Sequence, residues 1–300
     1  MLRSFRARVD AGESLCGDGA WGTQFMASGL KPGDAFEALN LERPEVLAEI
    51  AAAYVEAGAD LITTNTFGGS PLNLAGHGLA EKTEALNRAA VDAIESVAAG
   101  RAFVSGSVGP TGRILTPYGD TEPEVVAEGF SRQIGALIEA GADLICIETM
   151  MDLGEARLAV EAARRCSSSI PVVATMTFNA TPRGFFTTMG TTVEQACRAL
   201  VEAGANLVGS NCGNGIAAMV ELAREFAAHA TVPVAIQSNA GMPEDRGGEL
   251  YYPEGPDDTA ARVGELMDLG VAVIGGCCGT GPDHIRAVRA AIDRHRTAGS

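Results

Sequence analysis

The 300-residue sequence predicts an α/β fold, a (β/α)8 TIM barrel that forms a single domain over residues 1–300. Two patterns carry this prediction. A helix end, a capping glycine and a short apolar strand recur four times, with the glycines at Gly58, Gly141, Gly204 and Gly270. Four further apolar runs lie between these repeats, and amphipathic helical stretches separate the runs. Eight strands that alternate with helices imply a parallel sheet, and eight such units in a chain of this length favour a closed barrel over an open doubly wound sheet.

The strands are expected in eight segments along the chain. In order they are SLCGDGAWG from Ser14, VEAGADLITTNTF (Val55–Phe67), AFVSGSVGPTG from Ala102, IEAGADLICIETM (Ile138–Met150), PVVATMTFN from Pro171, VEAGANLVGSNCG (Val201–Gly213), VPVAIQSNAG from Val232 and MDLGVAVIGGCCG (Met267–Gly279). Stretches such as PEVLAEIAAAYVEAG and TVEQACRALVEAG supply helices between them. The loops after the odd-numbered strands are long, at 22–43, 109–122, 179–191 and 239–256. Because loops after strands build the C-terminal face of a barrel, we expect the functional site on that face.

Composition excludes several classes of partner. The formal net charge is -16, and no cluster of Lys or Arg interrupts the acidic pattern, so we expect no nucleic-acid partner and no anionic-membrane surface. No apolar run approaches the roughly 20 residues that cross a bilayer, and the N-terminus lacks the apolar stretch of a secretory signal. We therefore expect a cytoplasmic protein with no membrane partner, whose seven cysteines are reduced.

Three cysteines fall at the ends of predicted strands. Cys212 ends the sixth strand, and Cys277 and Cys278 end the eighth. In a barrel of eight strands, only one strand separates the sixth from the eighth, so the C-terminal ends of the sixth and eighth strands lie within reach of one ion. Three thiolates with a fourth position left open are typical of a catalytic zinc site, so these cysteines are predicted to bind Zn²⁺. The other four cysteines are expected to be ordinary core residues: Cys16, Cys146, Cys166 and Cys197.

The adjacent cysteines require an unusual backbone, because neighbouring side chains of a strand point to opposite faces. Gly275, Gly276 and Gly279 are expected to free this segment from strand geometry, so that both thiolates face one ion. Two alternatives remain. The same glycines, with Pro282 opening a helix, suit a phosphate-binding loop, although this leaves the cysteines unexplained. A vicinal disulfide or redox pair is disfavoured by geometry and by a reducing compartment.

Two acidic residues also lie at strand ends. Glu148 follows the apolar run DLICI, where a carboxylate is costly unless paired, and this makes it a candidate partner for a substrate ammonium group. Asp18 lies in GDGAWG, residues 17–22, which matches G-x-G-x-x-G. A dinucleotide fingerprint requires a helix directly after the last glycine, whereas we expect a long loop here. Asp18 is therefore expected to face the barrel mouth, and its neighbouring glycines to let backbone N–H groups approach a ligand carboxylate.

Seven motifs extend the pattern over nearly the whole chain, from about Leu15 to Ile292: DGAWGTQF, TTNTFG, SVGPTG, ETM, NCG, SNAG and GGCCGTGPDHI. In this order they closely resemble the homocysteine S-methyltransferase family, and most of all the homocysteine-binding barrel of its cobalamin-dependent members. The resemblance implies an enzyme in which zinc activates the thiol of homocysteine, and a methyl group is transferred to it to form methionine. It implies the metal ligands Cys212, Cys277 and Cys278, and it implies these substrate-binding residues: Asp18, Gly19, Ala20, Glu148, Thr149, Asn211, Ser238 and Asn239.

Two mechanistic expectations follow from this resemblance. Asn239 could lend its side-chain oxygen to the open zinc position before the substrate arrives. No protein side chain is expected to act as a general base in the transfer, because a thiol that binds zinc loses its proton.

The resemblance leaves the methyl donor open among a methyl-corrinoid protein, S-methylmethionine and betaine. The 300 residues hold one barrel and no D-x-H-x-x-G cobalamin motif, so a corrinoid donor is expected to arrive on a separate protein. Betaine would require an aromatic cage. The rim loops carry seven candidates for such a cage: Trp21, Phe67, Tyr118, Phe185, Phe186, Tyr251 and Tyr252. The 179–191 loop is the least familiar, and we expect it to influence donor or acceptor specificity.

Other functions stay open from the sequence. The same zinc chemistry could act on another thiol, or could run in reverse and demethylate a thioether. The chain could instead be a metal-binding subunit that docks a corrinoid protein, or a barrel with a phosphate site and no metal.

Overall fold

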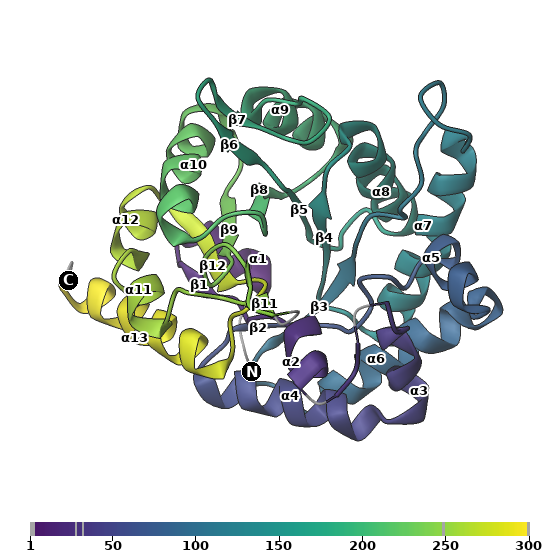
Figure 1. Cartoon of the computed structure of the whole chain (residues 1–300), viewed down its shortest axis with the longest axis horizontal. Helices are drawn as coiled ribbons and strands as arrows, with labels where there is room; N and C mark the ends of the chain where they lie inside the picture. The colour runs from purple at the N-terminus through teal and green to yellow at the C-terminus, as the bar shows by residue number, and fades with distance from the viewer. Residues whose placement is uncertain (1–3, 28, 32, 248–249, 299–300) are drawn as a thin grey trace.

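The computed structural model describes residues 4–27, 29–31, 33–247 and 250–298, and eight parallel strands form a nearly closed barrel at its centre (Figure 1). In chain order these strands are β1 (Leu15–Cys16), β2 (Leu61–Thr63), β3 (Phe103–Val108), β4 (Leu144–Met150), β5 (Val172–Met176), β8 (Leu207–Asn211), β9 (Val234–Ser238) and β12 (Val271–Gly276). Around the sheet the order is β1-β12-β9-β8-β5-β4-β3-β2. Each of the eight predicted segments contributes one strand, so the predicted (β/α)8 barrel is confirmed.

Helices surround these strands (Figure 1). They are α4 (Pro44–Ala57), α6 (Thr83–Ala98), α7 (Pro123–Ala140), α8 (Leu153–Cys166), α9 (Val193–Ala203), α10 (Ile216–His229), α11 (Pro256–Ala260), α12 (Val263–Asp268) and α13 (Pro282–Ala298). The predicted glycine caps end three of the long helices, with φ of 95° at Gly58, 105° at Gly141 and 110° at Gly204. Glycine adopts this left-handed conformation without steric cost, and so it turns each helix sharply into the next strand. Among the described residues, no helix has the length and apolar character needed to cross a membrane.

A short helix that the sequence analysis did not predict, α1 (Phe5–Asp10), lies against one end of the barrel. Phe5 and Val9 are buried in a cluster with inward-facing strand residues such as Leu15 and Leu144. The Phe5 ring meets the edge of the Phe103 ring at a centroid distance of 6.0 Å. Since these strand residues lie at the N-terminal ends of β1, β3 and β4, α1 closes the end of the barrel opposite the predicted site.

No strand ladder joins β1 to β2, which lie at the two ends of the strand order. In this seam between β1 and β2, a cluster of polar groups around Asp60 makes the connection instead. The Asp60 N–H donates to the Cys16 carbonyl at 2.7 Å, and the Asp60 carboxylate accepts from the Cys16 N–H at 2.8 Å. The same carboxylate pairs with Arg8 at 2.7 Å and with Arg289 at 3.0 Å. Asp60 therefore ties α1, β1, β2 and α13 together.

The long loops at the C-terminal ends of the strands contain short elements of their own. They are α2 (Gly22–Ala27), η1 (Phe36–Ala38) and α3 (Leu39–Glu42) after β1, the hairpin β6 (Asn179–Thr181) and β7 (Gly184–Phe186) after β5, and the hairpin β10 (Glu244–Asp245) and β11 (Leu250–Tyr251) after β9. Residues 28, 32, 248 and 249 of these predicted loops lie outside the described part of the chain.

The sequence analysis named long loops only after the odd-numbered strands, and the structure adds one after an even-numbered strand. A long excursion also follows β2, with α5 (Pro71–Leu74), η2 (Ala75–His77) and η3 (Ala80–Lys82). In the sequence, the short elements α5, η2 and η3 could not be distinguished from the amphipathic pattern of α6, which follows them.

Candidate metal centre

The three predicted cysteine ligands come together at the C-terminal end of the barrel. Strand β9 lies between β8 and β12, and two successive carbonyls of β9 fix the cysteine backbones. The Cys212 N–H donates to the Gln237 carbonyl at 3.2 Å, and the Cys277 N–H donates to the Ser238 carbonyl at 2.7 Å. The sulfur atoms of Cys212, Cys277 and Cys278 all lie within 4.8 Å of one another. Such a group of thiols could hold a metal ion.

The backbone achieves this convergence differently from the way the sequence suggested. Gly275 and Gly276 stay in the regular ladder of β12, and only Gly279 has a left-handed φ, of 82°. Gly276 is needed for space, because a Cβ atom there would lie 2.2 Å from the Thr280 hydroxyl oxygen. The strained residue is Cys212 itself, with φ of 62°. The expectation that glycines free the strand was therefore wrong for Gly275 and Gly276 and correct for Gly279: the adjacent thiols converge because a turn begins where β12 ends.

The three thiols affect one another's protonation strongly. Hydrogen bonds from the Cys277 and Cys278 thiols lower the pKa of Cys212 to about 3. The same interaction raises the pKa of Cys278 to about 11, and it raises the pKa of Cys277 well above its ordinary value. The pocket by itself therefore favours one thiolate and two thiols. Ionisation of all three requires a cation among them, which is the chemistry of a metal site.

Asn211 connects the thiols to the acidic side of the mouth. Its side-chain oxygen accepts from the Thr149 N–H at 2.7 Å and from the Thr175 hydroxyl at 2.8 Å. Its side-chain nitrogen donates to Thr149 Oγ1 at 2.7 Å, to Glu148 Oε2 at 3.3 Å and to the Cys277 sulfur at 3.8 Å. The ladder of β4 shifts register here, and Thr149 has φ of 59°, so its amide serves Asn211 instead of the sheet. The fully buried Asn211 thus fixes both halves of the site in one geometry.

Asp18 lies two residues after the end of β1 and is 2% exposed. Its carboxylate accepts from the Thr63 N–H at 2.7 Å, from the Thr63 hydroxyl at 2.8 Å and from Trp21 Nε1 at 2.9 Å. Burial raises the pKa of Asp18 to about 6 in spite of these three donors. Because these hydrogen bonds do not fully compensate the Asp18 carboxylate for its lost contact with water, Asp18 is suited to binding a positively charged ligand.

Glu148 is the second acid of the mouth. It accepts from the Ser107 hydroxyl at 2.6 Å, and it is half-buried. Burial raises the pKa of Glu148 to about 7, and the charge of Asp18 raises it further while the Ser107 hydrogen bond lowers it. Because the two carboxylates repel each other, a cationic group between them would stabilise both.

The other predicted substrate residues have different surroundings. Gly19 leaves no room for a side chain, since a Cβ atom would lie 2.8 Å from the Thr280 hydroxyl. Both backbone groups of Ala20 are engaged inside the protein, the N–H by the Thr280 carbonyl at 3.2 Å and the carbonyl by the Tyr54 hydroxyl at 2.6 Å. The buried oxygens Ser238 Oγ and Asn239 Oδ1 have no hydrogen-bond partner among the described residues. Of these four, Ser238 and Asn239 therefore present unused polar atoms.

The remaining cysteines and the glycine loops match the sequence only in part. All seven cysteines are free, and three of the four expected core cysteines are buried, whereas Cys166 is exposed. A short helix, α2, does begin at Gly22, so the expectation of a loop directly after GDGAWG was wrong. This helix spans six residues and the next strand begins only at Leu61, unlike a dinucleotide-binding unit. In the 279–281 loop, the Gly281 N–H donates to His284 Nδ1 at 3.3 Å, so this amide is engaged within the chain.

Two of the seven candidate cage residues, Trp21 and Tyr251, are engaged by other side chains. Trp21 is buried against Phe25 in the core, with ring centroids 5.9 Å apart. The Arg246 guanidinium covers the Tyr251 ring at 3.4 Å. Within the described ranges, no ring contact joins two of the seven candidates.

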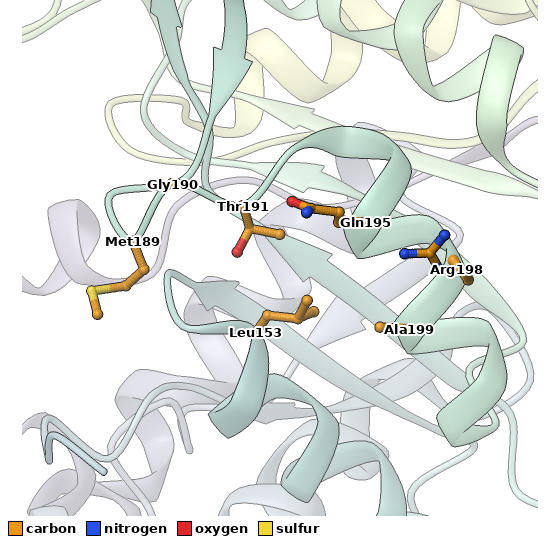
Figure 2. A pocket seen from close by; sticks show the side chains of 7 residues that line it. All are labelled: Leu153, Met189, Gly190, Thr191, Gln195, Arg198 and Ala199. Carbon is orange, nitrogen blue, oxygen red and sulfur yellow. The ribbon is translucent and has the colours of Figure 1, made fainter. Parts of the chain in front are cut away.

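A separate hollow of about 400 Å³ lies outside the mouth, beside the starts of α8 and α9 (Figure 2). It is lined by Leu153, Met189, Gly190, Thr191, Gln195, Arg198 and Ala199. The 179–191 loop contributes to it, but none of the thiols or acids of the metal centre does.

Three hydroxyl groups to which the sequence assigned no role support the acids and Asn211. Thr63, Ser107 and Thr175 hold Asp18, Glu148 and Asn211 respectively. All three lie in the C-terminal halves of barrel strands, and this position was the signal that could have found them.

Comparison with known proteins adds a family to this geometry. Residues 15–292 match the model of the family described as homocysteine S-methyltransferase. The methionine synthase of Mycobacterium leprae is 36% identical over 297 residues, a match that covers 93% of this chain and 24% of that protein. That of Mycobacterium tuberculosis is 36% identical over 296 residues, with the same coverage. The chain therefore spans about a quarter of the length of these relatives.

Among solved structures, the metallated form of the homocysteine methyltransferase MmuM from Escherichia coli superposes with a TM-score of 0.79. It is 24% identical, and the match covers 95% of this chain and 99% of that one. The apo form of MmuM gives a TM-score of 0.73 at 22% identity. At these identities the two structures support the barrel fold.

Proposed function

The chain belongs to the homocysteine S-methyltransferase family, and so to a family of methyltransferases, and we propose that it transfers a methyl group to the thiol of homocysteine at a zinc centre. One observation carries the proposal: three sulfur atoms within 4.8 Å of one another face the mouth of the barrel beside two acids with raised pKa values. The acids suit the amino group of an amino acid, and the thiols suit a thiophilic metal.

The donor set fits zinc. Cys212, Cys277 and Cys278 would hold the ion, and the buried Asn239 Oδ1 has no hydrogen-bond partner among the described residues, while the Asn239 side chain is close enough to Cys212 to help lower its pKa. A thiolate set with one further position open to an oxygen or a substrate sulfur is typical of catalytic zinc. When bound, zinc supplies the positive charge that keeps these sulfurs and a substrate sulfur ionised at neutral pH.

The protein's own residues would then orient the acceptor. Asp18 and Glu148 would bind the ammonium group of homocysteine, and Thr63 and Ser107 keep both carboxylates turned toward the mouth. Asn211 holds Glu148 and Cys277 in a fixed relation, so an amino acid anchored by its ammonium group would present its sulfur to the thiol side. The substrate sulfur would attack the methyl carbon as a thiolate, and the donor's leaving group would depart with the bonding electrons.

For the donor we propose a methyl-corrinoid protein or S-methylmethionine. Trp21 packs against Phe25 and the Arg246 guanidinium covers Tyr251, which disfavours these two rings as parts of a betaine cage, because a quaternary ammonium binds where several rings face one cation.

Metal analysis tests the proposal. The wild-type protein is expected to contain about one zinc per chain, and Cys212→Ser is expected to lose it together with at least about 100-fold in methyl transfer to homocysteine. Cys166→Ser is the matched control, because that cysteine is exposed and lies outside the cluster. Parallel assays with methylcobalamin, S-methylmethionine and betaine would identify the donor. Zinc-free wild type with full activity would refute the proposal.

A further inference from the structure

Glu254, near the end of the long loop after β9, contacts the segments that follow β8, β9 and β12, the three strands whose ends form the metal centre. Its N–H donates to the Ala240 carbonyl at 3.0 Å, in the loop after β9. Its carbonyl accepts from His284 Nε2 at 3.1 Å, in the helix after β12. Its carboxylate accepts from the Ile216 N–H at 3.0 Å, at the start of the helix after β8. One half-buried residue therefore joins all three segments.

Two glycines make room for the Glu254 side chain. A Cβ atom on Gly215 would lie 2.3 Å from Glu254 Oε1, and a Cβ atom on Gly241 would lie 3.1 Å from Glu254 Cγ. Gly215 is the N-cap residue of α10 and has no side chain to accept from the first N–H groups of the helix. The Glu254 carboxylate supplies this cap from another loop, where the positive end of the helix dipole favours an anion. Glu254 therefore fixes the start of α10.

This cap also limits the movement of the residues that lead out of Cys212. The φ of Cys212 is 62°, a conformation that a residue other than glycine keeps only where its surroundings impose it. The Asn214 carbonyl accepts from the Asn239 N–H at 3.0 Å, and two residues later the Ile216 N–H is held by Glu254. The segment after Cys212 is thus attached at two points to the loop that ends at Glu254.

The turn after Cys278 is held at both of its ends, and both ends lead to Glu254. At the first end, the Cys278 carbonyl accepts from the Ala240 N–H at 2.9 Å, and the Ala240 carbonyl accepts from the Glu254 N–H. At the other end, the Gly281 N–H donates to His284 Nδ1 at 3.3 Å, and Nε2 of the same ring donates to the Glu254 carbonyl. The His284 ring therefore connects this turn to Glu254.

We propose that Glu254 is a positioning residue of the zinc centre, which sets the separation between Cys212 and the Cys277–Cys278 pair. The inference rests on the proposed zinc centre. The three thiols would bind the ion directly, and Glu254 acts on them through the backbone of the segments that it joins. Groups outside the ligand set commonly orient metal ligands in this way. The contribution of Glu254 is expected in the metal affinity, because zinc binds best where its ligands already lie at the required spacing.

The test measures zinc affinity by competition with a chromophoric chelator. We expect Glu254→Ala to bind zinc about 10- to 100-fold more weakly than the wild type. Glu254→Gln should stay within about threefold, because its amide oxygen can still accept from the Ile216 N–H. Thr192→Ala is the matched control: the Thr192 hydroxyl caps α9 by accepting from the Gln195 N–H at 3.2 Å, and the loop before α9 carries none of the three cysteines. This variant should keep the wild-type affinity.

A second variant tests the other contact and leaves the cap of α10 intact. In His284→Asn, a side-chain oxygen can still accept from the Gly281 N–H, but the side chain is too short to donate to the Glu254 carbonyl. We expect zinc binding about three- to tenfold weaker, the effect of one lost hydrogen bond. In the cobalt(II)-substituted proteins, Glu254→Ala and His284→Asn should weaken the visible absorption bands, which are strongest at a tetrahedral site, and Glu254→Gln should restore them.

The outcomes separate the inference from the proposed function. Wild-type zinc affinity in both Glu254→Ala and His284→Asn would overturn the inference alone. An equal loss of affinity in Thr192→Ala would also overturn it, because the effect would then follow from the loss of any helix cap. Wild-type protein that binds no zinc would overturn the proposed function, and the inference with it.

Discussion

Replacing Glu148 by glutamine removes a charge that the fold opposes. The carboxyl has a pKa of about 7 instead of its ordinary 4.5, chiefly because of burial. Since the folded-state pKa is raised, the contribution of Glu148 to stability is fully present below pH 4.5 and is lost as the pH rises through 7. At about 1.4 kcal/mol for each pH unit, the difference corresponds to about 3 kcal/mol, and partial exposure to solvent reduces this to about 2 kcal/mol. Glu148→Gln keeps the shape of the side chain and does not titrate.

Urea unfolding at pH 5 and pH 8 measures this effect directly. Metal-free protein is used, because a bound ion adds its own pH dependence. We expect the wild type to lose about 2 kcal/mol more than Glu148→Gln between the two pH values, so that the variant is the more stable protein at pH 8. Glu49→Gln, an exposed change on α4, is the control and should follow the wild type. If Glu148→Gln followed the wild type as well, the buried-charge explanation would be refuted.

Two further predictions concern the parts of the barrel that support the site from a distance. Asp60→Asn removes the carboxylate that Arg8 and Arg289 share and leaves each with one other acid, Glu13 and Asp293 respectively, so it should cost about 2 kcal/mol of unfolding free energy in urea; an unchanged midpoint would contradict the role of Asp60 in the seam. Phe5→Ala removes the ring that packs on Phe103 and should cost about 3–4 kcal/mol while the zinc content stays at the wild-type level; loss of zinc in the folded variant would show that α1 does more than close the barrel.

The barrel could be predicted because its signals are local. Each strand is a short apolar run, and a glycine such as Gly141 or Gly204 marks the preceding helix end within a few residues. The parallel order then follows from the alternation of elements. Convergence of Cys212 with Cys277 and Cys278 followed from the strand order alone, since ends of near-neighbour strands meet at one face of the barrel.

What the sequence did not reveal depends on contacts between distant residues. Helix α1 is six residues long and makes sense only once Phe5 meets the barrel interior. The left-handed conformation of Cys212 goes against the preference of its residue type, so no local rule could assign the strain to it rather than to the nearby glycines. Likewise, the four residues that Asn211 joins lie on β4, on β5 and directly after β12, and a linear pattern does not contain that arrangement.

The unusual features of the site all have the same effect on the stability of the ligand-free protein. Asp18 and Glu148 have raised pKa values, the three thiols cannot all ionise without a cation, and Cys212 has a strained backbone. Each feature destabilises the ligand-free fold, and each is relieved by a cation of suitable chemistry, an ammonium group for the acids and a metal for the thiols. A ligand that binds only the folded state shifts the unfolding equilibrium in proportion to its affinity. The closed barrel end at α1 and the Asp60 seam therefore supply stability far from the mouth, where the requirements of binding lower it.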